Sequence, residues 1–98
     1  DINPYLMLAA VLGAALNGVD DAVAPPAPVT GNAYALTDLP QLAPDWASAI
    51  SAFESSPLIA RIFAPLLISN MVMTKRQELA RFADLPRETH WHSYLEAV

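Results

Sequence analysis

The sequence contains no cysteine, so it can form neither a disulfide nor a thiolate metal site. It is also poor in charge, because 15% of its 98 residues are charged, against roughly 25% in ordinary soluble domains. Hydrophobic residues make up 54% of the chain. That level excludes intrinsic disorder over most of the length, since disorder requires low hydrophobicity and high net charge. The composition predicts at most one domain, with a surface unusually apolar for a free monomer.

The net charge of the chain is −5, and basic residues are missing from positions 1–60. All five lie in the remaining part of the chain: Arg61, Lys75, Arg76, Arg81 and Arg87. Binding to nucleic-acid phosphates needs clustered cations, and the nearest approach to a cluster here is interleaved with acidic residues. We therefore expect no nucleic-acid partner.

A long hydrophobic run is missing as well. The longest uncharged apolar stretch covers residues 2–19, which is shorter than the roughly 20 residues of a membrane-spanning helix. A secretory signal would begin with a basic segment, and none precedes this stretch. An interfacial anchor over residues 4–16 would need a charged face, which is also lacking. We expect no membrane partner and a cytoplasmic protein.

Residues 4–16 predict a helix that is apolar on every side. Asp1 or Asn3 can cap its start, and Asn17-Gly18 offers a left-handed end. A helix without a polar face has to be covered all round, and a chain of this length has too few other elements to cover it. We therefore expect the cover to come from other protein and the chain to be a piece of something larger.

Residues 20–44 contain five prolines and predict an extended arm that docks through its apolar side chains. Proline and capping signals then predict further helices over about 45–55, 57–63, 65–82 and 87–97. The helix over 65–82 has a candidate buried stripe, which consists of Ile68, Met71, Val72, Leu79 and Phe82. Glu78 and Arg81 are expected to pair on its solvent side. The fold class is mainly α, with four to five helices, a long proline-rich arm and no strand.

No catalytic, cofactor or metal site follows from residue spacing. His90 and His92 are two positions apart, so on a helix they point in different directions and cannot share a metal. Asp20-Asp21 lacks further oxygen ligands nearby, and no serine has a base at a readable spacing. The three glycines are scattered, which excludes a glycine-rich phosphate loop.

The chain resembles the C-terminal part of the glutamine synthetase family. The resemblance begins with Asn3-Pro4-Tyr5-Leu6, which opens an alanine- and leucine-rich helix. It continues in order through Gly31-Asn32-Ala33-Tyr34, Leu39-Pro40, Lys75-Arg76-Gln77-Glu78 and Tyr94-Leu95-Glu96-Ala97-Val98. The Gly-Asn-Ala-Tyr segment is most similar to the γ-glutamylpolyamine (γ-glutamylputrescine) synthetase branch.

The resemblance implies that residues 1–98 are the incomplete, helical C-terminal segment of an α+β catalytic domain. The parent would be a nitrogen-metabolism ligase that uses ATP and Mg²⁺ or Mn²⁺ to join glutamate to ammonia or another amine. Catalytic residues of the family lie upstream of the Asn-Pro-Tyr motif, so the resemblance places none in this chain. The isolated chain would bind no cofactor and would be inactive.

Family members assemble as stacked rings, so the resemblance implies a homo-oligomer as well as contact with the rest of the parent chain. Trp91, Tyr94, Leu95 and Val98 are the candidate oligomer contacts. Tyr34 falls where bacterial relatives can be modified, although its neighbours lack the acidic residues of that pattern. The alternative is a free-standing helical interaction module that buries its first helix against a partner.

Overall fold

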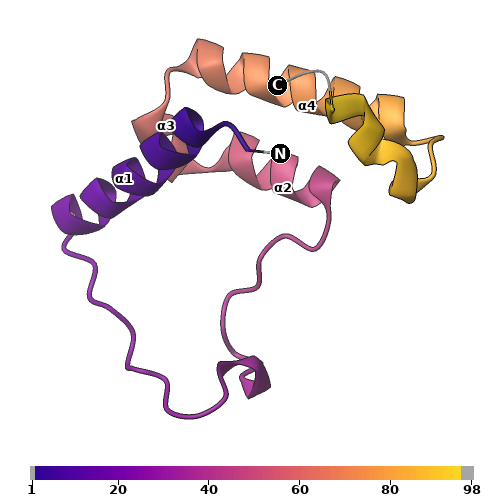
Figure 1. Ribbon diagram of the computed structural model, residues 1–98. Coiled ribbons are helices and arrows are strands. Elements are labelled where there is room, and N and C mark those ends of the chain that lie inside the picture. Colours follow the sequence, from indigo (N-terminus) through magenta and orange to yellow (C-terminus); the bar gives the residue numbers. More distant parts are fainter. Residues whose placement is uncertain (1, 96–98) are drawn as a thin grey trace.

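The computed structural model describes residues 2–95, and Figure 1 shows helices joined by irregular segments. The α-helices are α1 (Pro4–Asp20), α2 (Trp46–Ser55), α3 (Pro57–Ile62) and α4 (Pro65–Phe82). Two 3-10 helices are η1 (Ala33–Ala35) in the arm and η2 (Arg87–Tyr94) after α4. No strand occurs between residues 2 and 95, which confirms the mainly α class.

Helix α1 starts at the predicted place. The Oδ1 atom of Asn3 accepts hydrogen bonds from the backbone N–H groups of Tyr5 (3.1 Å) and Leu6 (3.2 Å). These two bonds satisfy donors that a helix start leaves without an intrahelical partner. Of the two candidate caps, Asn3 is therefore the one used, while Asp1 lies outside the described residues.

The predicted end of α1 at Asn17-Gly18 is wrong, because the helix continues to Asp20. The left-handed residue is Ala22, with φ +50°. The N–H of Val23 donates to the carbonyl of Gly18 (3.0 Å), and that of Ala22 donates to the carbonyl of Val19 (3.1 Å). This pair of bonds is a Schellman motif, with alanine at the position that glycine usually occupies.

The boundaries of α2, α3 and α4 agree with the prediction to within one residue. Asp45 caps α2 by accepting a 2.7 Å bond from the N–H of Ser48, and Ser56 caps α3 by accepting from the N–H of Ile59 (3.3 Å). The break before α4 falls at Ala64, whose ψ of 145° is extended. The following proline causes this break, since it disfavours α geometry at the residue before it.

The helices pack as two pairs, α1 on α3 and α2 on α4. At the first contact Gly13 lies so close to Ile62 that a Cβ on the glycine would be 2.7 Å from Ile62 Cγ1. At the second, Val72 is buried with Ile50. The predicted stripe of α4 is confirmed, since Val72 and Phe82 are buried and its other three members are half-buried.

The pairing predicted on the solvent side of α4 differs in one partner. Glu78 pairs with Lys75, at 2.8 Å and i, i+3 spacing, and not with Arg81. The guanidinium of Arg81 instead lies over the ring of Phe82, 6.0 Å from its centroid. Lys75 and Arg81 both lie three positions from Glu78. Lys75 forms the ion pair with its carboxylate, and Arg81 makes the cation–π contact with Phe82 instead.

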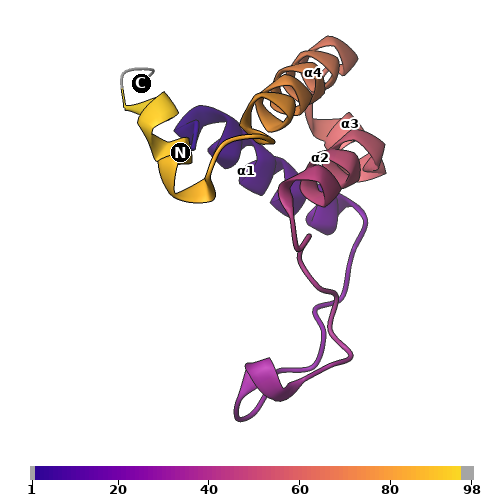
Figure 2. The same ribbon diagram turned by 90° about the vertical axis from the view of Figure 1, so that its right-hand side faces the viewer.

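The arm begins after α1 and covers residues 22–44, so Asp20 and Asp21 belong to the helix end and not to the arm. Figure 2 shows the arm reaching away from the helices. The apolar side chains of the arm do not dock on this chain, because all of them are exposed, and their docking on another surface stays a prediction. They are Val23, Val29, Tyr34, Leu36, Leu39 and Leu42.

The last segment is a 3-10 helix and not the predicted α-helix, and its described part ends at Tyr94. Its residues are mostly poor helix formers, and it packs on α4 through aromatic rings. The ring of Phe82 lies 4.9 Å from that of His90 and 5.7 Å from that of Tyr94. The predicted stretch beyond residue 95 lies outside the described residues.

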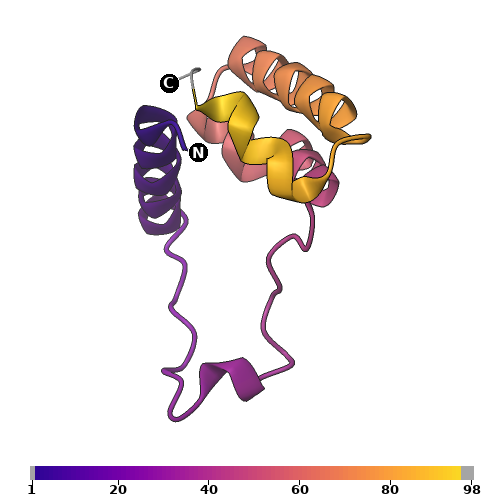
Figure 3. The same ribbon diagram turned by 45° about the vertical axis from the view of Figure 1, so that its right-hand side comes forward.

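Residues 2–95 do not enclose a compact core. The accessible surface of the chain is 8237 Å², whereas a folded monomer of this mass exposes about 5,400 Å². Its radius of gyration is 16.6 Å, against about 13 Å for a compact domain of this length. Figure 3 shows α1 standing to one side of the α2–α4 pair. Among the described residues, no helix combines the length and apolar character needed to cross a bilayer.

Candidate functional site

The most unusual surface is the side of α1 that faces away from α3. We call it the outer face of α1 and define it as Tyr5, Leu8, Val11, Leu12, Leu16 and Val19. Their exposed fractions run from 53% for Leu8 to 83% for Tyr5. On a helical projection these positions are centred on the side of the helix away from Gly13 and Asn17, the residues that contact α3, with Leu16 and Tyr5 at the edge nearest Gly13.

No charged residue occurs from Pro4 to Val19, so nothing on this helix makes the outer face suited to water. Contiguous exposed apolar patches of more than a few hundred Å² are rare on soluble monomers and mark interaction sites. The outer face of α1 is therefore the candidate site, and its chemistry is that of a docking surface.

Two long-range ion pairs join the helices within each packed pair. Arg61 of α3 donates to Asp21 at the end of α1 (2.6 Å), and this hydrogen bond raises the pKa of Arg61. Arg76 of α4 donates to both carboxylate oxygens of Glu54 on α2, at 3.1 and 2.5 Å. With Lys75 on Glu78, three of the five basic residues are bound within the chain.

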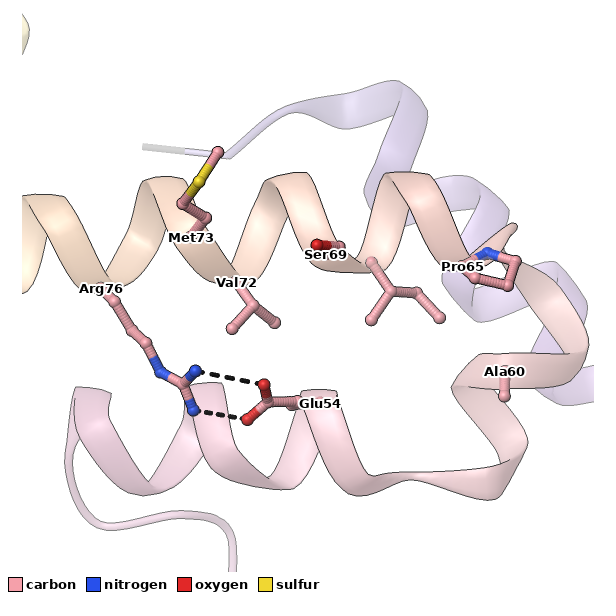
Figure 4. Close-up of a pocket in the computed structure, with 8 residues that line it drawn as sticks. Glu54, Ala60, Pro65, Ser69, Val72, Met73 and Arg76 are labelled. Atoms are coloured by element: carbon pink, nitrogen blue, oxygen red, sulfur yellow. Dashed lines mark hydrogen bonds and ion pairs between the residues drawn. The ribbon is translucent and has the colours of Figure 1, made fainter.

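Figure 4 shows the groove between α2 and α4, with Arg76 and Glu54 across its mouth and Val72 pointing inward. Its volume is about 500 Å³, and its lining is mostly apolar. The only charged groups in the lining are Glu54 and Arg76, which neutralise each other. The groove therefore presents no unpaired charge that could orient a polar substrate.

Tyr34 lies at the tip of the arm and is fully exposed. Its N–H donates to Oδ1 of Asn32 (3.1 Å), which caps the short turn η1. The phenol is accessible from solvent, and no described residue hydrogen-bonds to it.

The four candidate oligomer contacts separate into three situations. Trp91 and Leu95 are exposed, at 56% and 66%, and are free to touch another surface. Tyr94 is half-buried against Phe82, and its hydroxyl lies 3.5 Å from the carboxylate of Glu78. Burial, reinforced by that carboxylate, raises the pKa of Tyr94. Val98 lies outside the described residues.

The two histidines occupy separate environments. The ring of His90 stacks on Phe82, and its Nε2 lies 3.1 Å from the carbonyl of Leu85, whereas His92 packs edge-on against Trp91. Within residues 2–95, no three histidine, aspartate or glutamate side chains gather closely enough to hold a metal ion. The described residues therefore do not fit a divalent metal site.

The sequence did not predict the two long-range ion pairs, which lie within this one chain. Arg61 and Asp21 are 40 positions apart, and Arg76 and Glu54 are 22 apart. Helical periodicity relates only residues three or four positions apart, so no sequence signal could have found these pairs.

The described residues combine an apolar helix with one uncovered side and no enclosed core, so that side is suited to contact with other protein. The family comparison agrees, because the chain matches the family model described as glutamine synthetase, catalytic domain, over residues 1–94. The chain belongs to the glutamine synthetase family. Comparison with curated proteins gave no match, and neither did comparison with solved structures.

Proposed function

We propose that this chain is the C-terminal helical segment of an ATP-dependent glutamate–amine or glutamate–ammonia ligase, where it forms part of the domain wall and a subunit contact. The observation that carries the proposal is the uncovered outer face of α1 in a chain that matches the family over residues 1–94. An apolar helix face of this kind is stable only against other protein.

The surface area supports an extensive contact. The chain exposes roughly half as much surface again as a compact monomer of its mass. A standard protein interface buries about 800 Å² on each partner, which is well below that excess. The outer face of α1 and the apolar residues of the arm would supply the contact with the rest of the domain.

In this proposal the reaction centre lies outside the chain. ATP and Mg²⁺ or Mn²⁺ would be held by residues upstream, since the described residues do not fit a metal site and most of the basic residues are already paired. The role of this segment is to support that centre and to exclude water from the side that α1 covers.

The first experiment measures ADP release by the purified chain with ATP, glutamate and either ammonia or putrescine. We expect no release. Turnover by these residues alone would overturn the placement of the reaction centre upstream.

A second experiment tests by complementation whether the chain has the proposed structural role. The upstream part of the parent domain, produced separately without residues 1–98, should be inactive and should regain activity when this chain is added. If the upstream part is fully active alone, the structural role is wrong. If the chain instead binds an unrelated protein and never the upstream part, the alternative of a free interaction module replaces the proposal.

Three finer points belong to the same proposal. The γ-glutamylpolyamine branch, supported by Gly31-Asn32-Ala33-Tyr34, would show as putrescine being preferred to ammonia in the complemented enzyme. Stacked rings would use Trp91 and Leu95, which are exposed. Modification at Tyr34 would be read as a mass gain on the arm, and a cytoplasmic location stays a prediction.

A further inference from the structure

Asn17 and Gly18 form an Asn-Gly pair within α1, at the contact with α3. The residue Asn17 is 8% exposed, and its Nδ2 donates a long hydrogen bond to the carbonyl of Leu58 (3.5 Å). Asparagine followed by glycine is the dipeptide most prone to deamidation, because no side chain on the second residue hinders attack by its backbone nitrogen. The reactive Asn17-Gly18 dipeptide therefore lies where the fold buries the asparagine side chain.

We propose that Asn17 is a deamidation site that reacts only when the end of α1 leaves its contact with α3 and unwinds. The backbone nitrogen of Gly18 attacks Cγ of Asn17, forms an N–Cγ bond, loses its proton and expels Nδ2 as ammonia. Water then opens the resulting succinimide, which leaves aspartate or isoaspartate at position 17. Water is the only co-reactant.

The closed helix prevents the first step. Gly18 lies inside α1, where its N–H takes part in the helical hydrogen-bond ladder and cannot fold back on the preceding side chain. The reaction therefore requires local opening, and its rate follows the population of the open state. Because α1 packs on one side only, that opening breaks few contacts.

The product favours the open state. A carboxylate at position 17 would face the carbonyl of Leu58 without a proton to donate, in a nearly dry site. It would stand three and four positions before Asp20 and Asp21, at the negative end of a helix whose last turn contains no basic residue. The cation on the facing helix, Arg61, is already bound to Asp21. Because deamidation is irreversible, aspartate or isoaspartate at position 17 marks the chains in which α1 has opened.

The test follows the deamidation of Asn17 by peptide mass spectrometry in the full chain, in native buffer and in concentrated urea. We expect the native rate to be at least about tenfold lower, which corresponds to an opening free energy of about 1.4 kcal/mol or more. Asn3, Asn32 and Asn70 are internal references, because none of them precedes glycine. Equal rates in buffer and urea would overturn the proposal.

Three variants test whether the contact between α1 and α3 controls the deamidation rate. Ile62→Asp disturbs the α1–α3 contact and should raise the native rate toward the urea value. Leu66→Asp adds the same charge at an exposed position, 73% accessible, and should leave the rate unchanged. Gly18→Ala should suppress the reaction in both solvents without disturbing the fold, since a Cβ there meets nothing within 4 Å. A wild-type rate in Ile62→Asp, or an undiminished reaction in Gly18→Ala, would contradict the mechanism.

Discussion

At the residue scale, Gly13 determines how closely α1 approaches α3. A methyl group at this position would lie 2.7 Å from two carbons of Ile62, which is closer than van der Waals contact allows. Gly13→Ala should therefore destabilise the α1–α3 pair by about 1–3 kcal/mol, the usual cost of overpacking. Urea denaturation followed by circular dichroism measures the change.

Gly18→Ala is the matched control, because it makes the same chemical change on the same helix in open space. It should be neutral or stabilising by up to about 1 kcal/mol, since alanine is the better helix former. Equal effects of the two substitutions would show that the close approach at Gly13 is not realised in solution.

A second residue-scale prediction concerns Asp45. Hydrogen bonds from the backbone N–H and then the hydroxyl of Ser48 lower the pKa of Asp45 below its ordinary value of 3.8. A carboxylate with a lowered folded-state pKa stabilises the fold fully above the unfolded value, and this contribution is lost as the pH falls through the folded value. The helicity of α2 should therefore fall in acid below about pH 3.8.

Asp45→Asn keeps an oxygen that can accept from the Ser48 N–H but removes the titration. The variant should retain α2 at neutral pH and lose that part of the acid dependence, as read from pH titrations monitored by circular dichroism. An unchanged acid transition in Asp45→Asn would mean that another carboxylate controls it.

At the scale of elements, apolar packing should outweigh the ion pair in joining α2 to α4. The side chains of Arg76 and Glu54 are 54% and 44% exposed, so water and salt screen their attraction. A double-mutant cycle with Glu54→Gln and Arg76→Gln should give a coupling below about 1 kcal/mol that decreases with added salt. Val72→Ala, at a site only 4% exposed, should cost about 1–3 kcal/mol.

Chemical denaturation of the four proteins in the cycle, together with Val72→Ala, decides between the two contributions. A coupling energy larger than the stability lost in Val72→Ala would show that the ion pair between Arg76 and Glu54, and not apolar packing, is the main link between α2 and α4.

At the scale of the whole molecule, the outer face of α1 should respond to mutation according to what covers it. Leu8 and Leu12 are 53% and 62% exposed in the chain by itself. Leu8→Asp or Leu12→Asp should change the stability of the isolated chain by no more than about 0.5 kcal/mol, as surface substitutions do. In the complemented parent domain the same carboxylate would be buried without a partner, at a cost of several kcal/mol.

Size-exclusion chromatography and ligase activity of the complemented protein measure this difference. Met73→Asp is the control, because Met73 is 63% exposed but lies on α4 and not on the outer face of α1. A fully active, correctly assembled Leu8→Asp enzyme would show that the face is not covered as proposed.

Most helix boundaries could be predicted because their causes are local. Asn3, Asp45 and Ser56 cap the helices that follow them through hydrogen bonds spanning two or three residues. The end of α1 could not be predicted in the same way. The side chain of Asn17 contacts α3 across 41 positions, and the left-handed turn moved to Ala22.

The candidate site shows the same division. The apolar character of residues 4–16 and the Asn-Pro-Tyr-Leu opening were visible in the sequence, and they led to the family that the comparison then established. Which side of α1 remains uncovered, and that the apolar residues of the arm find no place on this chain, appeared only in the structure.

The sequence by itself therefore determined where most helices begin, which of them is apolar all round, and the family. Tertiary structure alone decided that Gly13 meets Ile62, that Asp21 and Glu54 bind cations far along the chain, and that α1 has only one covered side. The physical reason is range. Caps and proline breaks act over a few residues, whereas packing depends on which distant surfaces meet once the helices have formed.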